Sequence, residues 1–392
     1  MKTNKPLEGI KIIEISTIIT ASLSAMMLAD QGAEVVKIEQ TGFGDPLRYL
    51  GTQKGGISAI FANVNRGKSS VELDLKKETD LNFAKKLISE ADVLLNNFRP
   101  GVMESLGISR EECKKLNEDL IYVSITGFGK KGSFSSNPAY DHVVQAMSGA
   151  TAIQSDLEKP QYMKTLLCDK ITAYTATQSI CSALFKRERT GEASSIDLSM
   201  LDASMFFLWP DGMMNNTLLD DDVQNLPPLT ASYNMYECKN GSISIAAMLD
   251  KHWHGIFKAV DKPELIDDER YSSAAERSKN FMQLLELVSL FKNYTVDEMF
   301  NRLTENDVPC SKNLTLEQAI TNQQVKDNEL VTEQNTETQG VVRMIRYPAL
   351  FDEEKFINNK PAPKLGEDNS CLLYTSDAAD DSLRVDLGGR RI

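Results

Sequence analysis

The sequence lacks long apolar runs, signal-peptide features and metal-ligand spacings. Its 392 residues contain no stretch of about 18 consecutive apolar residues, so no transmembrane helix is expected. The N-terminus, MKTNKPLEG, has no apolar core of the kind found in signal peptides. The six cysteines form no CxxC pair and no metal-ligand spacing, which is typical of a protein in a reducing compartment. These absences predict a cytoplasmic protein with no membrane partner and no metal site.

Positive charge and nucleotide-binding glycine motifs are also scarce. The net charge of −13 argues against a nucleic-acid binder, because such proteins need an excess of Lys and Arg to displace phosphate counterions. The segment STIITAS, which follows the first predicted strand, has no glycine, so the G-x-G-x-x-G fingerprint of NAD and FAD sites is absent. The glycine-rich segment 127–134 lacks the spacing of a phosphate-binding loop. Any anionic ligand must therefore be met by local basic groups.

The sequence does contain a repeated alternation of apolar strands and amphipathic helices. Two strand–helix–strand units are predicted, the first at 9–16, 21–30 and 33–38, the second at 70–75, 80–89 and 92–98. Ser109 and Glu112 form a predicted capping box before the next helix, and LIYVSITGF is the next strand. This alternation predicts an α/β protein with a Rossmann-like, doubly wound parallel sheet.

The second half of the chain has a different pattern, and a chain of this length should form two domains. Residues 1–208 are assigned to a large domain, and residues 209–229, rich in Pro, Asn and Asp, to a linker. Residues 230–325 are assigned to a smaller α+β domain. It is predicted to contain a hairpin at 233–247 and helices at 251–260, 274–294 and 296–304, the last with Thr295 and Glu298 as a capping box.

The segment from Ala139 to Gly191 organises the chemistry. A short apolar strand, Thr165–Cys168, is predicted to end on Asp169, which opens a helix. Ligands of open α/β sheets bind where strands end, and the N–H groups of a helix start can hold negative charge. Asp169 could also be only an N-cap residue, and Asp141 could cap a helix at 142–148. Cys168 is expected to be a small apolar residue ending a buried strand.

Six blocks of the sequence resemble recurrent blocks of the family III (CaiB/BaiF-like) CoA-transferases, and they occur in the family's order from about Leu7 to about Glu367. They are PLEGIKIIEIS, LADQGAEVVKIE, GDPLR, NRGKSSVELDLK, NNFRPGVMESLG and ALFKRERTGEASSIDLSMLDA. The resemblance implies that the domain at 1–208 binds CoA and that residues 326–370 return to it, with a strand at 340–350. It also implies an interlocked homodimer.

The final residues, 371–392, depart from the family pattern after LGEDNS and show no apolar periodicity. The sequence CLLYTSDAAD also matches the translation of a transposon end used in sequencing libraries. We therefore interpret 371–392 as a non-native tail and exclude it from the fold.

The resemblance implies a reaction as well as a fold. In the family an aspartate attacks an acyl-CoA, giving a mixed anhydride and then an aspartyl-CoA thioester that a small carboxylate accepts. That nucleophile corresponds to Asp169, and Tyr140 and Asp141 are implied to lie beside it. A carboxylate suits this role because its thioester conserves the energy of the substrate thioester. No cofactor is expected to be bound permanently, since CoA and acyl-CoA are substrates.

The resemblance also implies a set of CoA-binding residues. Those around the adenine nucleotide are Leu73, Lys76, Asn97, Phe98 and Arg99, with Thr20 and Gln40 nearby. Gln40 and Ser105 stand where characterised members have arginines, so the phosphate contacts depart from the family pattern. Lys37, Lys68 and Lys130 could supply the positive charge or could be solvated surface charges.

Two alternatives remain open at this stage. The racemase branch of the superfamily uses a histidine and a distant carboxylate, so an acyl-CoA racemase or epimerase could use Asp169 as an acid/base group. In this chain Tyr140 occupies the place of that histidine, and the carboxylate would fall near Leu249. The second alternative is a non-catalytic CoA-binding subunit with the same fold.

Overall fold

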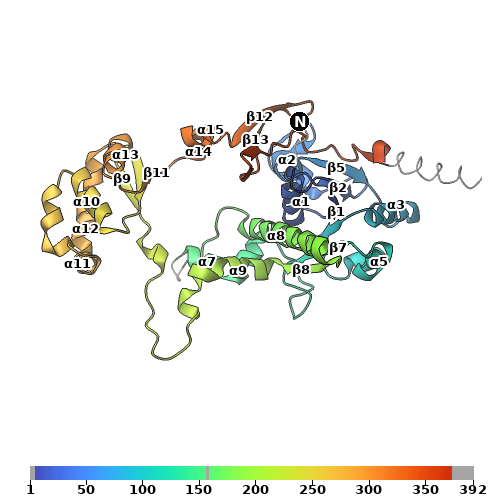
Figure 1. Cartoon of the computed structure of the whole chain (residues 1–392), viewed down its shortest axis with the longest axis horizontal. Coiled ribbons are helices and arrows are strands. Elements are labelled where there is room, and N and C mark those ends of the chain that lie inside the picture. The colour runs from blue at the N-terminus through green and yellow to red at the C-terminus, as the bar shows by residue number, and fades with distance from the viewer. Residues whose placement is uncertain (1–4, 156–158, 373–392) are drawn as a thin grey trace, which may run out of the picture. The chain divides into compact units, whose positions relative to one another are not determined.

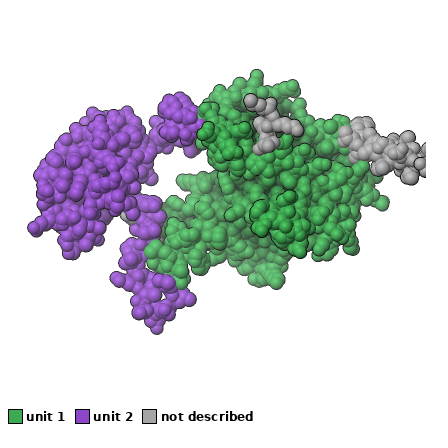
Figure 2. Space-filling model, in the orientation of Figure 1, with its two compact units in different colours: residues 1–217, 329–392 green, residues 218–328 purple. Residues whose placement is uncertain are grey.

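The structure is a computed structural model that describes residues 5–155 and 159–372. The described chain forms two compact units (Figure 2). Unit 1 contains the chain up to Thr217 and again from Glu329 onward, and unit 2 contains Leu218–Asn328. Most of the predicted non-native tail, residues 373–392, lies outside the described residues. Among the described residues, no helix combines the length and the apolar character needed to cross a membrane.

Six strands of unit 1 form a parallel sheet (Figure 1). They are β1 (Lys11–Ile15), β2 (Glu34–Glu39), β5 (Lys68–Glu72), β6 (Val93–Asn96), β7 (Ile121–Thr126) and β8 (Ser195–Ser199). Their order is β5-β2-β1-β6-β7-β8, and each neighbouring pair runs parallel. The order reverses direction between β1 and β6, which is where sheets of this class bind ligands.

Helices cover both faces of this sheet, because alternate residues of each strand point to opposite sides. Ile12 packs on the face covered by α1 (Thr20–Asp30) and α8 (Leu167–Thr190). Ile13 packs on the opposite face, which α3 (Glu78–Ser89) and α5 (Arg110–Leu116) cover. The predicted doubly wound α/β fold is confirmed. The predicted Ser109–Glu112 capping box also forms, at the start of α5.

Further helices and short strand pairs complete unit 1. They are α2 (Ala59–Asn65), α4 (Val102–Ser105), α6 (Asp141–Ser148), α7 (Ala150–Gln154), α9 (Met200–Gly212) and the short strand pairs β3 (Gln53–Lys54) with β4 (Ile57–Ser58) and β14 (Leu350–Phe351) with β15 (Glu354–Lys355). Helix α9 extends to Gly212, inside the predicted linker 209–229, because an uninterrupted apolar run, Met205–Trp209, continues the helix up to the predicted boundary.

Two expectations about unit 1 are wrong. No strand forms at 165–168; instead α8 begins at Leu167, so Asp169 lies in the first turn of the helix and is not its N-cap residue. The apolar run TLLC is too short for periodicity to separate a strand from the start of a helix. Strand β5 begins at Lys68 and ends at Glu72, whereas the prediction was 70–75, so Leu73 and Leu75 have left the sheet.

Unit 2 has its own core around a small antiparallel sheet. The predicted hairpin is confirmed as β9 (Met235–Cys238) and β10 (Gly241–Ile245), and β11 (Cys310–Lys312) pairs with β10. The helices are α10 (Asp250–Ala259), α11 (Ala274–Lys279), α12 (Phe281–Val288), α13 (Val296–Glu305), α14 (Leu316–Thr321) and α15 (Gln323–Asp327). The helix predicted at 274–294 is wrong in its length, because it is interrupted at Asn280. The Thr295–Glu298 capping box is confirmed.

After unit 2 the chain returns to unit 1. Strands β12 (Val331–Thr336) and β13 (Gly340–Ile345) form an antiparallel pair, so the strand predicted at 340–350 is shorter than expected. Farther along, Asp368 Oδ2 accepts a hydrogen bond from Ser70 N at 2.8 Å, and Asn369 Oδ1 accepts one from Glu72 N at 2.9 Å. These side chains cover N–H groups of β5, the edge strand of the sheet.

Candidate active site

Two neighbouring cavities lie where the strands next to the reversal point end. The larger, of about 470 Å³, is lined by residues that follow β1, β2 and β5. The smaller, of about 220 Å³, is lined by residues that follow β1, β6 and β7, together with Tyr140, Asp169 and Met200. Thr17 and Phe98 line both cavities, so the two share a wall. The arrangement offers one extended region at the carboxyl edge of the sheet.

Asp169 is a largely buried carboxylate in the wall of the smaller cavity. Its side chain comes from the first turn of α8, and its Oδ1 accepts a hydrogen bond from Thr20 Oγ1 at 2.6 Å. Thr20 is the first residue of α1. The pKa of Asp169 is raised to about 6, mainly by burial; the Thr20 hydrogen bond lowers it and the negative charge of Asp141 raises it. A carboxyl group of this pKa is mostly ionised at neutral pH but is easily protonated below it.

Asp141 contacts the backbone of Asp169 but lines neither cavity. Its Oδ1 accepts the backbone N–H of Asp169 at 3.1 Å, and its Oδ2 accepts Gln145 Nε2 at 2.6 Å. The expectation that Asp141 caps its own helix is wrong, because it is the first residue of α6 and Tyr140 is the N-cap residue. Asp141 instead binds an N–H group in the first turn of α8. The backbone N–H of Asp169 is therefore already hydrogen-bonded and is not available to a ligand in the cavity.

Tyr140 lines the smaller cavity with a side chain that is 60% exposed. The Tyr140 ring is therefore largely exposed. His142 lies beside it, with its ring stacked at 6.5 Å from the Tyr140 ring. Among the described residues that line the two cavities, none is a histidine.

The predicted CoA-binding residues are divided between the two cavities. Those that line the larger cavity are Gln40, Leu73, Lys76 and Phe98. Those that line the smaller cavity are Thr20, Asn97, Phe98 and Arg99. Leu73 reaches the cavity because β5 ends at Glu72 and the chain then leaves the sheet. Ser105, which stands where an arginine is common in the family, lies in α4 and lines neither cavity.

Lys37 and Lys68 are fully buried, so their interpretation as solvated surface charges is wrong. Each lies 2.7 Å from a different oxygen of Glu14, which is also fully buried. Burial opposes ionisation of Glu14, but the two ammonium groups hold the pKa of its carboxyl well below its usual range. Lys130, in contrast, is partly exposed and pairs with Asp197 at 2.6 Å. None of the three lines either cavity.

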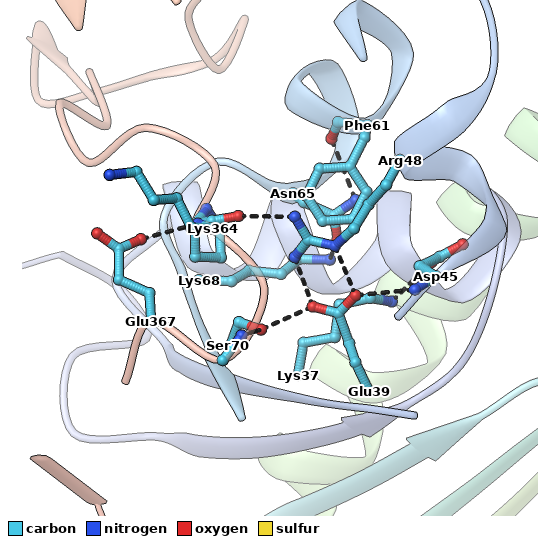
Figure 3. A network of polar contacts seen from close by, with 12 residues as sticks. Lys37, Glu39, Asp45, Arg48, Phe61, Asn65, Lys68, Ser70, Lys364 and Glu367 are labelled. Carbon is cyan, nitrogen blue, oxygen red and sulfur yellow. Dashed lines mark hydrogen bonds and ion pairs between the residues drawn. The ribbon is translucent and has the colours of Figure 1, made fainter. Parts of the chain in front are cut away.

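A second buried pair extends this network towards the larger cavity (Figure 3). Glu39 accepts hydrogen bonds from Arg48 at both carboxylate oxygens, at 2.6 and 2.8 Å, and one from Ser70 Oγ at 2.7 Å. Glu39 also accepts the backbone N–H of Asp45 at 3.0 Å. Asp45 and Arg48 belong to the GDPLR block, but the sequence reasoning singled out neither residue. The Asp–Pro pair, which favours the start of a turn, was the available signal.

Known proteins resemble this chain over nearly its whole length. Residues 7–369 match the protein family described as CoA-transferase family III. A probable fatty acyl-CoA transferase of Mycobacterium tuberculosis, Rv3272, is 29% identical over 386 residues, which are 94% of this chain and 98% of that protein. The crystal structure of Rv3272 superposes with a TM-score of 0.82 and covers 94% of this chain and 99% of that one.

A further relative is more similar over a shorter span. The acetyl-CoA:oxalate CoA-transferase of Acetobacter aceti is 35% identical over 283 residues, which are 71% of this chain and 73% of that protein. The family match, the relatives and the fold agree with the resemblance that the sequence blocks carry. The chain therefore belongs to CoA-transferase family III and is a CoA-transferase.

Proposed function

We propose that this protein transfers CoA from an acyl-CoA to a small carboxylate through an aspartyl-CoA thioester on Asp169. The observation that carries the proposal is the placement of Asp169. It is a buried carboxylate, hydrogen-bonded by Thr20, in the wall of a cavity at the reversal point of the sheet. The relatives whose names state a reaction, such as the acetyl-CoA:oxalate CoA-transferase, support the same class of substrates.

The proposed reaction needs only the carboxylate and the two substrates. Asp169 attacks the thioester carbonyl of acyl-CoA. The carbon–sulfur bond breaks, the CoA thiolate departs, and a mixed anhydride between the acyl group and Asp169 forms. The thiolate then attacks the Asp169 carbonyl, releasing the acyl group as a carboxylate and leaving the aspartyl-CoA thioester. The acceptor carboxylate then attacks the aspartyl-CoA thioester, which gives a second mixed anhydride and frees the CoA thiolate. The thiolate attacks the acceptor's carbonyl carbon in this anhydride, which forms the new acyl-CoA and restores the Asp169 carboxylate. Electrons and atoms balance without an added cofactor.

The two cavities support a division of the CoA molecule. The larger one has apolar walls, including Ile38, Leu73 and Phe98, and the cationic Lys76 also lines it. These are the features that an adenine ring and its phosphates require. The smaller one holds Asp169 and Arg99 and would receive the thioester end. The assignment of CoA binding to the part of the chain before residue 209 stays a prediction.

We also propose that two copies of the chain associate, interlocked as the family resemblance implies. In support, aromatic side chains of α8 and α9 are exposed beside a cavity of about 850 Å³ that Met27, Ile171 and Tyr347 also line. The exposed residues that line this cavity are Tyr174, Phe206 and Phe207, and Trp209 is exposed next to Pro210, which also lines it. Exposed apolar patches of this kind usually mark interaction sites.

The test of the carrier role is the substitution Asp169→Asn. The amide cannot form the anhydride, so turnover should fall by about a thousandfold or more while CoA binding persists. Turnover is measured by mass spectrometry of new thioesters after incubation with a panel of acyl-CoA esters and carboxylates. Hydroxylamine added during turnover should mark the Asp169 peptide of the unmodified protein.

A matched control is Asp202→Asn, which changes an exposed aspartate in the first turn of α9 that lines neither cavity. It should leave turnover unchanged. If folded Asp169→Asn retained near-normal CoA transfer, the carrier assignment would be wrong. Deuterium entering the α-carbon of an acyl-CoA without CoA exchange would identify a racemase instead. CoA binding with neither reaction would identify a binding subunit.

A further inference from the structure

The loop Ser16–Thr20, which joins β1 to the first residue of α1, holds a residue in an unfavourable backbone conformation. Ile18 has φ of 66°, in the left-handed region. A β-branched residue rarely adopts this conformation, since its side chain then crowds the backbone. Such a residue keeps this conformation only where surrounding groups hold it there, and such sites often serve a function. The contacts of the loop Ser16–Thr20 identify the groups that hold Ile18 in this conformation.

Two side chains that follow the strands on either side of β1 hold consecutive peptide groups of this loop. Asp45 Oδ1 accepts the backbone N–H of Ile18 at 3.0 Å. Asn97, which follows β6, binds Thr17 on both sides: Oδ1 accepts Thr17 N at 3.1 Å and Nδ2 donates to Thr17 O at 2.7 Å. The loop is thus fixed from the β2 side and the β6 side of β1 at once.

The Asp45 carboxylate is itself held rigidly. Its side chain is fully buried, and its Oδ1 also accepts Leu47 N at 2.9 Å. Its Oδ2 lies 3.1 Å from Lys37 Nζ, and Lys37 in turn donates to Ser16 O, at the start of the same loop, at 3.1 Å. The backbone N–H of Asp45 is bound by Glu39 (Figure 3). A carboxylate with so many contacts cannot follow a shift of the loop.

The loop reaches both parts of the candidate site. Thr17 lies in the wall that the two cavities share, and Thr20 donates its hydroxyl hydrogen to Asp169. A change of backbone conformation at Ile18 would displace both residues. The geometry points to Asp45 as a positioning residue that keeps Ile18 left-handed and thereby holds Thr20 against Asp169. This inference rests on the proposed role of Asp169 and adds a residue that does not touch the reacting atoms.

The experiment compares the loop with and without the Asp45 carboxylate that accepts the Ile18 N–H. Asp45→Ala should lower kcat by about tenfold or more, because Thr20 loses its place beside Asp169. Glycine adopts the left-handed conformation without crowding, so Asp45→Ala combined with Ile18→Gly should recover about fivefold of that loss. Asp45→Ala combined with Ile18→Ala should recover nothing. Alanine is the matched control, since both substitutions remove the same isoleucine contacts but only glycine relieves the backbone.

A merely structural role for Asp45 predicts a different pattern. The unfolding temperature would then be lowered in every protein that carries Asp45→Ala. The kcat of the folded fraction would be unchanged, and glycine and alanine at position 18 would give the same kcat. Equal kcat of the two double variants, or an unchanged kcat in Asp45→Ala, would overturn the inference. If Asp45→Ala does not fold, Asp45→Asn decides, because its amide oxygen can still accept the Ile18 N–H: kcat should stay within about threefold of the unmodified protein, and a loss of about tenfold or more in folded Asp45→Asn would overturn the inference.

Failure of this inference is distinguishable from failure of the proposed function. If Asp169 is not the carrier, hydroxylamine will not mark its peptide in the unmodified protein. If Asp45 is not a positioning residue, that peptide is marked as expected and only the rescue by Ile18→Gly is missing.

Discussion

At the scale of single residues, Asp169 must be ionised to attack a thioester, although its surroundings favour the neutral carboxyl group. Burial and the nearby charge of Asp141 raise its pKa, and the hydrogen bond from Thr20 lowers it. The two neighbours therefore act in opposite directions on the same proton. Their contributions can be separated, because each can be replaced by a side chain of nearly the same shape.

The pH dependence of kcat/KM should reveal this opposition. Because the pKa of Asp169 is raised to about 6, the ionised fraction, and with it kcat/KM, should fall as pH drops through that value. Asp141→Asn removes a negative charge and should move the profile to lower pH. Thr20→Val removes the hydrogen bond to the carboxylate and should move it to higher pH. Initial rates between about pH 5 and pH 8 measure both shifts.

The direction of the two shifts is the decisive observation. A profile that moves the same way in Asp141→Asn and Thr20→Val, or that does not move in either, contradicts the assignment of the titration to Asp169. Asp202→Asn, the exposed control, should give the profile of the unmodified protein.

At the scale of elements, a buried ionic cluster joins three neighbouring strands. Glu14 lies in β1, Lys37 in β2 and Lys68 in β5, and all three side chains are fully buried. Lys68 also donates to Ser22 O in α1 at 2.8 Å. The cluster thus connects the sheet to the helix that carries Thr20. Removing the Glu14 charge leaves Lys68 buried without its paired carboxylate and Lys37 with Asp45 alone, which is far more costly than losing an exposed pair.

Glu14→Gln should lower the free energy of unfolding by about 3 to 5 kcal/mol, measured by urea or thermal denaturation. The control is Arg343→Gln, which removes a half-exposed ion pair with Glu333 in the same unit and should cost no more than about 1 kcal/mol. A Glu14→Gln protein as stable as the control would show that the buried charges are not coupled as the structure indicates.

The elements also show what the sequence can and cannot predict. The capping boxes at Ser109 and Thr295 are correctly predicted because their contacts lie within four residues. The start of α8 is missed, because the neighbours that decide between strand and helix are distant in sequence. The sequence gives a partial signal for the burial of Lys37, because in the strand EVVKIE it lies on the same face as the apolar Val35. Its ion-pair partner Glu14 could not be predicted, since it lies 23 residues away.

The candidate site also contains residues that the sequence predicts and residues that it does not. Asp169 and most of the predicted CoA-binding residues were identified because they lie in sequence blocks that resemble a family. The left-handed Ile18 could not be predicted, since neither glycine nor asparagine marks the position and the groups that hold it come from Asp45 and Asn97. Backbone conformations imposed by tertiary contacts leave no local signal in the sequence.

At the scale of the whole molecule, the exposed aromatic residues of α8 and α9 predict self-association. Sedimentation or light scattering should give the mass of two chains. Phe206→Asp, at a side chain 82% exposed, should shift the mass towards one chain, because a buried charge without a partner disfavours the interface. Leu116→Asp, on the exposed side of α5, is the control and should leave two chains. A single-chain mass for the unmodified protein would contradict the proposed dimer.

The covering of strand β5 by the end of the chain has a consequence for synthesis. The N–H group of Ser70 is bound by Asp368, a residue 298 positions later, and that of Glu72 by Asn369, 297 positions later. On the ribosome, all of unit 2 is synthesised before these residues. The nascent chain therefore carries an open sheet edge through most of translation. A ribosome that stalled after residue 328 would release a chain with a complete small unit and an edge strand free to pair with other chains.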